Sequence, residues 1–250
     1  MACTFVAMSD TNADYGFDAP LVPALLGGLG LLALAIGIVL LATGSSAGGG
    51  LLVMGAVMTA SALSFVYTTR IGKFRWWAKI LDGLALRGDE EVLDMGCGRG
   101  AVLVAVAKRV PRGTATGIDL WRSVDQSGNA PEVTTANATA EGVVDRVELR
   151  TGNMLDMPFA DDHFDLVVSS LAIHNIRDRD DRRTAVDEAV RVLRPGGRLA
   201  IADIQAGKVY AERLTELGLL DVHRTSLGPT SWFGGPWMST SLVTGTKPPT

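Results

Sequence analysis

The sequence predicts an α/β fold in which a doubly wound, mostly parallel sheet is preceded by a hydrophobic helical hairpin. Three observations lead to this prediction. No Asp, Glu, Lys, Arg or His occurs in residues 19–69. From Glu90 onward, short apolar runs alternate with helix-like segments, which indicates a parallel sheet covered on both faces. The first run contains Asp94 and leads into the glycine-rich segment 96–100, a pattern typical of a strand, a tight turn and a helix.

Four parts follow from this division. Residues 1–20 are a short acidic segment that we expect to be mobile, and residues 21–69 are a transmembrane helical hairpin. Residues 70–88 are an amphipathic linker helix, and residues 89–250 are the α/β domain. All 23 Lys and Arg and 24 of the 27 Asp and Glu lie after residue 69. That part of the chain is therefore nearly neutral, which argues against nucleic acid as a partner.

Two apolar runs make up the predicted hairpin. Residues 21–43 are long enough to span a hydrocarbon core of about 30 Å at about 1.5 Å per residue. Residues 51–67 form a shorter second span, and residues 44–50 form an uncharged turn. The flank before the first run is acidic and the run is long, so a secretory signal is not expected. Two runs of this length also argue against buried core helices.

Small residues recur at four-residue spacing in both spans, which either allows close packing of the helices or reflects ordinary composition. These residues are Ala33 and Gly37, then Ala56, Ala60 and Ser64. Basic residues follow the second span directly and mark the cytoplasmic side. They are Arg70, Lys73, Arg75 and Lys79. We therefore expect an integral membrane protein with both termini and the α/β domain on the cytoplasmic side.

Two aromatic segments have alternative interpretations. Trp76 and Trp77 lie among the basic residues of the linker helix, where they either occupy the lipid headgroup layer or cover the sheet. Trp232, Phe233 and Trp237 lie in a glycine- and proline-rich turn. They either contact the membrane or a hydrophobic acceptor, or fill a corner between the last strands. Cys97, one of only two cysteines, is expected to fill a small slot in the glycine turn.

The elements of the α/β domain follow from this alternation. We expect strands near 91–95, 115–119, 146–150, 164–170 and 197–203, with helices near 100–110, 131–141, 180–193 and 207–217. The connection 120–129 is long and carries Trp121 with several polar residues. It is either part of a lid over the site or a decorative insertion.

The segment Val92–Gly100 resembles the first motif of the class I S-adenosylmethionine (SAM)-dependent methyltransferases. Three later segments, Gly152–Phe159, Phe164–Ser170 and Val192–Leu199, are similar to further motifs of that family and occur in the same order. The nearest resemblance is to the quinone-biosynthesis type. It implies the class I methyltransferase fold, with an antiparallel pair of strands near 219–226 and 238–246 at the edge of the sheet.

The resemblance also implies a SAM site. Its expected residues are Asp94, Gly96, Cys97, Gly98, Gly100, Asp119, Leu120, Asn153, Met154 and Ser170. The backbone of the glycine turn would approach the methionine part of SAM, and Asp94 would orient that turn or the ammonium group. Asp119 would accept from both ribose hydroxyls. Asn153 would accept from the adenine amino group, and many relatives have Asp at this position.

No general base is evident from a motif. His174 follows the fourth strand, at the edge where doubly wound folds bind ligands. It is a candidate base, and packing or a cofactor contact is the alternative. Asp203 ends the fifth strand and either lines the acceptor pocket or caps the next helix. Both are therefore candidate catalytic residues.

The expected function is that of a membrane-anchored SAM-dependent methyltransferase. Its expected partners are the lipid bilayer and a lipophilic small-molecule acceptor, either quinone-like or a prenylated phenol. A phospholipid N-methyltransferase and a non-catalytic SAM- or nucleotide-binding membrane module are the alternatives. We also expect residues 70–250 to bind SAM without the hairpin. The sequence does not fix the atom methylated or the oligomeric state.

Overall fold

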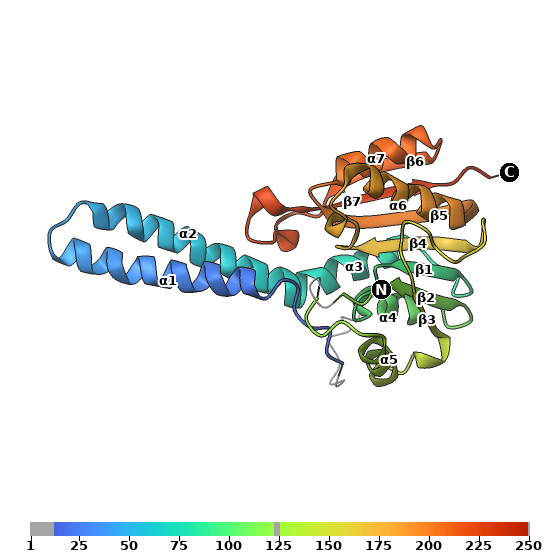
Figure 1. Ribbon diagram of the computed structural model, residues 1–250, viewed down its shortest axis with the longest axis horizontal. Coiled ribbons are helices and arrows are strands. Elements are labelled where there is room, and N and C mark those ends of the chain that lie inside the picture. Colours follow the sequence, from blue (N-terminus) through green and yellow to red (C-terminus); the bar gives the residue numbers. More distant parts are fainter. Residues whose placement is uncertain (1–12, 123–125, 250) are drawn as a thin grey trace, which may run out of the picture.

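The computed structural model describes residues 13–122 and 126–249, in which a long helical hairpin projects from an α/β domain (Figure 1). The hairpin consists of α1 (Leu21–Ala42) and α2 (Ala47–Tyr67). Both of its ends lie at the domain, and the connection between the helices is at the far tip (Figure 1).

The α/β domain is built on a sheet that has seven strands within the described residues. These are β1 (Glu91–Met95), β2 (Thr114–Asp119), β3 (Val147–Thr151), β4 (Phe164–Ser170), β5 (Leu193–Ile204), β6 (Leu220–Ser226) and β7 (Thr240–Thr246). Their order is β3-β2-β1-β4-β5-β7-β6, and β7 is antiparallel to both neighbours while the other pairs are parallel. The winding reverses between β1 and β4, which is where such sheets form a ligand crevice. The predicted fold class is confirmed.

Helices cover both faces of the sheet. They are α3 (Lys73–Gly83), α4 (Ala101–Ala107), α5 (Pro131–Ala140), α6 (Arg179–Val192) and α7 (Gly207–Glu216). Alternate strand residues enter different apolar clusters: Leu93 packs with residues of α6 and α7, and Val92 packs with residues of α3 and α4. This alternation is the two-residue period of a strand buried on both faces.

One strand differs from its predicted bounds. β5 begins at Leu193 and includes the Arg-Pro-Gly-Gly segment that we expected to precede it. Leu193 pairs with Phe164 and Arg198 pairs with Leu166, so β5 advances by five residues where β4 advances by two. This irregularity accommodates the glycine-containing segment inside the sheet.

The tip of the hairpin is shorter than predicted. α1 ends at Ala42 and α2 begins at Ala47, so Gly48, Gly49 and Gly50 are helical instead of forming a turn. Gly48 faces α1, where its Cβ would lie 2.6 Å from the Gly37 carbonyl oxygen. Close helix packing therefore accounts for a glycine in a helical position where the sequence suggested a turn.

Glycines set the contact between α1 and α2. A Cβ at Gly55 would lie 2.7 Å from the Gly30 carbonyl oxygen, just as Gly48 faces Gly37. The prediction of close packing is right for Ala33 and Gly37, which are buried. It is wrong for Ala56 and Ala60, which are exposed. On α2 the packing positions recur at seven-residue spacing and involve glycine, which brings the two backbones together.

The second helix continues into the domain. A π-helical segment, η1 (Thr68–Gly72), joins α2 directly to α3. A loop between β6 and β7 docks on this junction: Thr68 Oγ1 donates to the Trp232 carbonyl at 2.9 Å, and Ser64 Oγ donates to the same oxygen at 3.0 Å. Ser64 thus contacts the domain. At Gly72 a Cβ would lie 2.1 Å from the Thr230 carbonyl oxygen, so only glycine fits there.

The aromatic residues near this junction divide between core and surface. Trp76 and Trp77 are 4% and 2% exposed and pack in the apolar cluster between α3, α4 and the sheet. The interpretation that their rings occupy the lipid headgroup layer is therefore wrong. Phe233 is buried, with its ring centroid 5.1 Å from that of Phe65 on α2. Trp237 is 67% exposed. The predicted aromatic turn therefore fills a corner with one ring and exposes another.

The first residues do not all lie apart from the domain. Residues 13–18 contact it, and Asp18 forms an isolated bridge with Gln126. The predicted mobility is therefore wrong for these residues, whereas residues 1–12 lie outside the described part of the chain.

Two helices are long and apolar enough to cross a membrane by length and composition. They are Leu21–Ala42 and the continuous helix Ala47–Gly83, with mean hydropathies of 2.6 and 1.8 over their most apolar windows. Only 17% and 22% of those windows are buried, unlike the core helix of a soluble domain. Large side chains such as Leu25 and Val39 are 63% and 61% exposed.

We predict that Gly55→Leu destabilises the hairpin. A larger side chain meets the backbone of α1, and overpacking of this kind costs about 1–3 kcal/mol. Gly50→Leu is the matched control, because a Cβ there meets no atom within 4 Å. Thermal unfolding of the detergent-solubilised protein, followed by circular dichroism, should show a lower midpoint for Gly55→Leu only. Equal midpoints for the two variants would contradict the glycine contact.

Candidate functional site

A cavity of about 400 Å³ lies at the carboxyl ends of the parallel strands. Its wall includes the turn after β1, the ends of β2 and β4, and the loop after β3. Of the ten residues expected to bind the cofactor, the following nine line it: Asp94, Gly96, Cys97, Gly98, Asp119, Leu120, Asn153, Met154 and Ser170. The structure thus brings together residues that are as far apart in sequence as 94 and 170.

The glycine turn approaches its neighbours too closely for any other residue. Gly96 has φ of 73°, and a Cβ there would lie 2.3 Å from the Ala172 Cβ. Gly98 has φ of 51°, and its Cβ would lie 2.5 Å from the Gln126 side-chain oxygen. Gly100 does not line the cavity. It precedes α4 in the left-handed conformation, where a side chain is strained.

Asp94 is a buried carboxyl group without a hydrogen-bond partner. The residue is 1% exposed, and neither of its oxygens has a partner among the described residues. Burial, and secondly the charge of Asp119, raises the pKa of Asp94 to about 8, with a smaller opposing effect of the Leu103 amide. A buried acid in this state is stabilised as a carboxylate by a neighbouring cation. The cavity beside Asp94 therefore suits a positively charged group.

Asp119 is engaged with the protein through both oxygens. One oxygen accepts from the Gly98 amide at 2.9 Å, and the other accepts from the Trp121 amide at 2.7 Å and the Asn129 side chain at 3.2 Å. The carboxylate therefore ties the glycine turn to the connection after β2. Asp119 also lines the cavity, which is compatible with the expected contact with ribose hydroxyls. That contact stays a prediction. Leu120, 41% exposed, extends the same wall.

Cys97 packs where the sequence suggested. Its side chain is buried, and a Cβ added at Gly117 of β2 would lie 2.7 Å from the Cys97 sulfur. Burial, and then the charges of Asp94 and Asp119, raises the pKa of the Cys97 thiol well above its ordinary value. The thiol therefore stays protonated and fills space, which makes it a poor nucleophile.

The loop after β3 supplies Asn153 and Met154. The Asn153 side-chain oxygen accepts from the Leu155 amide at 3.1 Å, so the atom expected to contact adenine already has one donor. Met154 packs partly against the core. Ser170, at the end of β4, accepts from the Trp77 indole N–H at 2.8 Å, which ties the cavity wall to α3.

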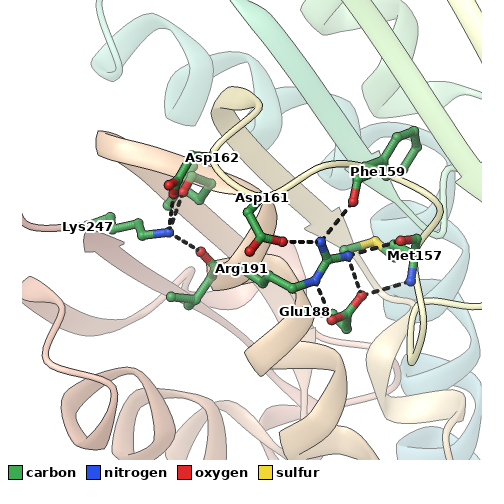
Figure 2. Close-up of polar contacts among 9 residues, drawn as sticks. Met157, Phe159, Asp161, Asp162, Glu188, Arg191 and Lys247 are labelled. Carbon is green, nitrogen blue, oxygen red and sulfur yellow. Dashed lines mark hydrogen bonds and ion pairs between the residues drawn. The ribbon is translucent and has the colours of Figure 1, made fainter.

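The side chain of Arg191, on α6, hydrogen-bonds to the backbone of this loop (Figure 2). Its guanidinium donates to the Phe159 and Met157 carbonyl oxygens at 2.8 and 3.0 Å. It also pairs with Glu188 at 2.7 Å, and Glu188 accepts from the Met157 amide at 2.8 Å. The hydrogen bond from Arg191 is the main cause that lowers the pKa of Glu188. The expected adenine loop is therefore fixed by two charged residues outside the cavity.

His174 and Asp203 form a hydrogen-bonded pair. Asp203 Oδ1 lies 2.6 Å from His174 Nδ1, and Oδ2 accepts from the His174 amide at 2.9 Å and from the Tyr210 hydroxyl at 3.0 Å. Burial, and secondly Asp203, raises the pKa of Tyr210, which therefore stays a donor. Neither His174 nor Asp203 belongs to the cavity wall described above. The expectation that Asp203 caps α7 is wrong, because its carboxylate is engaged by His174, Ile204 and Tyr210 and α7 has no side-chain cap, whereas the expectation that it lines an acceptor pocket stays a prediction.

Several residues of the cavity wall were not predicted. They include Asp18, Lys73, Arg99, Gln126 and Asn129. Asp18 is the last charged residue before the uncharged run, and this position was the one available signal for it. Gln126 and Asn129 show that part of connection 120–129 does contact the site. Its residues 123–125 lie outside the described part.

The sequence profile of a family described as "Methyltransferase domain" matches residues 93–201. The chain is 34% identical over 134 residues to the ubiquinone/menaquinone biosynthesis C-methyltransferase UbiE of Roseobacter denitrificans, covering 53% of this chain and 50% of that protein. It is 35% identical over 133 residues to the demethylmenaquinone methyltransferase of Lactiplantibacillus plantarum, covering 52% of each. The chain thus spans about half the length of these relatives.

Solved structures share the fold. A geranyl diphosphate methyltransferase in complex with SAM matches with a TM-score of 0.56 and 18% identity, covering 70% of this chain and 85% of that one. The [4+2]-cyclase SpnF matches with a TM-score of 0.59 and 20% identity, covering 71% and 81%. The second match shows that this fold alone does not determine the reaction.

We predict that SAM binds more tightly as the pH rises from about 6 to 8. With a pKa of about 8, Asp94 is protonated at neutral pH in the free protein. A cationic ligand favours its carboxylate, so binding releases a proton and gains affinity by up to about tenfold for each pH unit below 8. Calorimetry in buffers of different ionisation enthalpy measures this release. Asp94→Asn should abolish it, and an unchanged release in that variant would assign the proton to another group.

Proposed function

We propose that this chain is a class I SAM-dependent methyltransferase and that it transfers a methyl group from SAM to a lipophilic acceptor at a membrane surface. The observation that carries the proposal is the position of the cavity. It lies at the base of the hairpin, where Asp18, just before α1, and Lys73, just after η1, both line it. A site at the base of two candidate membrane spans would lie within reach of an acceptor held in the bilayer.

The cavity fits SAM in charge and shape. The unpartnered carboxyl group of Asp94 suits the cationic methionine end, and the bare backbone at Gly96 and Gly98 admits close approach. Asp119 and the Asn153–Met154 pair line the rest of the wall. SAM supplies an electrophilic methyl group when bound, so the protein has to hold donor and acceptor in line and exclude water. The cavity is large enough for a ligand of this class.

The lipophilic acceptor is supported by an apolar cluster between the cavity and the hairpin. Leu171 lines the cavity and packs against the cluster that contains Phe65 of α2 and Phe233. The names of the two relatives refer to quinone methylation. A quinone-like or prenylated phenolic acceptor, held in the bilayer by its chain, would reach such a site at high local concentration.

Membrane anchoring and sidedness complete the proposal. The apolar side chains of α1 and α2 are largely exposed, which a hydrocarbon environment would favour. Basic residues lie in η1 and on α3, among them Arg70 and Lys79, and basic flanks favour the cytoplasmic side. We therefore place the domain on that side, with SAM supplied from the cytoplasm.

For His174 and Asp203 we propose a positioning role. Asp203 fixes both the amide and the ring of His174, and thereby the short helix η3 (Ile173–Asn175). The neighbours Ala172 and Ile176 belong to the cavity wall, whereas the His174 ring does not. The pair thus orients the wall that would face the acceptor.

The proposed reaction is tested with the full-length protein in liposomes. Isotopically labelled SAM and a demethylated quinol bearing a long prenyl chain should give a labelled lipid product, detected by mass spectrometry. Asp119→Ala should weaken SAM binding by about 1.5–3 kcal/mol, the range for hydrogen bonds to a charged group. Tight SAM binding by the wild type without label in any lipid fraction would refute the lipophilic acceptor.

The role of His174 is tested by its Gln variant. If the pair positions the wall, His174→Gln should raise KM for the acceptor and lower kcat less than about tenfold, with the pH profile unchanged. A general base typically contributes about 10²–10⁴-fold. A loss of that size together with disappearance of the acidic limb would instead make His174 the base.

A further inference from the structure

Residues 13–18, which we call the N-terminal arm, lie against the glycine turn and lead directly into α1. The arm comes from a part of the chain that precedes the candidate spans, yet Asp18 belongs to the cavity wall. No resemblance to the methyltransferase motifs covers this segment, since the family match begins at residue 93. Its contacts were therefore not expected from the sequence.

Asn137 of α5 holds the start of the arm. Its side-chain oxygen accepts from the Asp14 amide at 2.8 Å, and its side-chain nitrogen donates to the Asp14 carbonyl at 2.9 Å. The same nitrogen donates to the Arg99 carbonyl in the glycine turn at 2.9 Å. Asn137 is only 3% exposed. One buried amide therefore joins the arm to the turn with both of its polar atoms satisfied.

Gln126 makes a second connection between the arm and the turn. Its side-chain oxygen accepts from the Arg99 amide at 3.0 Å, and its nitrogen donates to the Tyr15 carbonyl at 3.1 Å. The oxygen occupies the space where Gly98 has no side chain. The Gly98 amide in turn donates to Asp119. Hydrogen bonds at the adjacent residues Gly98 and Arg99 thus link the arm, through the glycine turn, to the carboxylate expected to bind ribose.

Charged contacts complete the attachment. The Arg99 guanidinium pairs with Asp14 at 2.8 Å. Lys73 pairs with Asp18 at 2.8 Å, and the Lys73 side chain is 6% exposed. This second pair joins the residues on either side of the hairpin, because Asp18 precedes α1 and Lys73 begins α3. Buried charges are retained only when paired, so Lys73 depends on the arm being in place.

We propose that the N-terminal arm is part of the cofactor site and forms the wall that closes over the glycine turn, so that SAM binding depends on both ends of the hairpin being docked at the cavity. The inference rests on the cofactor assignment of the proposed function. It replaces the expectation that residues 70–250 bind SAM unaided, because that fragment lacks Asp14, Tyr15 and Asp18. It also requires the arm and the domain to lie on the same side of the membrane.

Two substitutions in the full-length protein test the arm, with SAM as the probe. Gln126→Glu keeps an acceptor for the Arg99 amide but replaces the donor to Tyr15 by an oxygen that repels that carbonyl and Asp18. Asp18→Asn removes the charge opposite Lys73. Each should weaken SAM binding about tenfold, as loss of a hydrogen bond to a charged group does, and should raise the SAM dissociation rate. Asp82→Asn is the control, because it breaks the ion pair between Asp82 of α3 and Arg109, which follows α4, and neither residue lines the cavity.

The outcomes separate this inference from the proposed function. Calorimetry gives the affinity, and stopped-flow fluorescence gives the dissociation rate, with circular dichroism as a check that each variant is folded. Wild-type affinity and dissociation rate in both variants would overturn the arm while leaving the cofactor assignment intact. An equal loss in Asp82→Asn would overturn it as well, since the effect would then be one of general stability. Absence of SAM binding by the wild type would overturn both.

Discussion

The close contact between the turn after β1 and the end of β2 is the constraint on which the site depends. The Gly96 and Cys97 amides both donate to the Ile118 carbonyl, at 2.8 and 3.2 Å. The Cys97 sulfur occupies the place where Gly117 has no side chain. Because the turn is pressed against β2, the ends of the two strands meet at one cavity and α4 starts from a fixed position. A larger residue on either side would separate them.

That contact brings two acidic residues into the same cavity, and the structure treats them differently. Asp119 receives donors from the glycine turn and from the connection after β2, whereas Asp94 receives none and is held at a raised pKa. Two carboxylates without partners would repel each other in a buried site. The protein provides hydrogen-bond partners for Asp119, which leaves the Asp94 carboxyl group available to a cationic group of a ligand.

The hairpin is attached to the domain at both of its ends, by a continuous helix after α2 and by the contacts of the N-terminal arm before α1. Helix α2 runs through η1 into α3, whose Trp77 contacts the cavity wall at Ser170. At the other end, the N-terminal arm contacts the glycine turn. The fold itself is shared with proteins of different reaction types. In this chain the apolar hairpin is attached to two walls of the cavity, through Asp18 before α1 and Lys73 after η1.

The sequence by itself determined the local elements, because each depends on a pattern of neighbouring residues. Alternating apolar runs placed the strands, the uncharged run placed the hairpin, and the glycine turn with Asp94 and Asp119 marked the cavity. Only the tertiary structure decided which residues from distant segments meet. The packing of glycine against glycine between α1 and α2, the burial of Trp77, the pairing of His174 with Asp203, and the contact of Asp18 with Lys73 all depend on long-range geometry. Such contacts leave no periodic signal in a single chain, since any short polar or small residue satisfies the local pattern equally well.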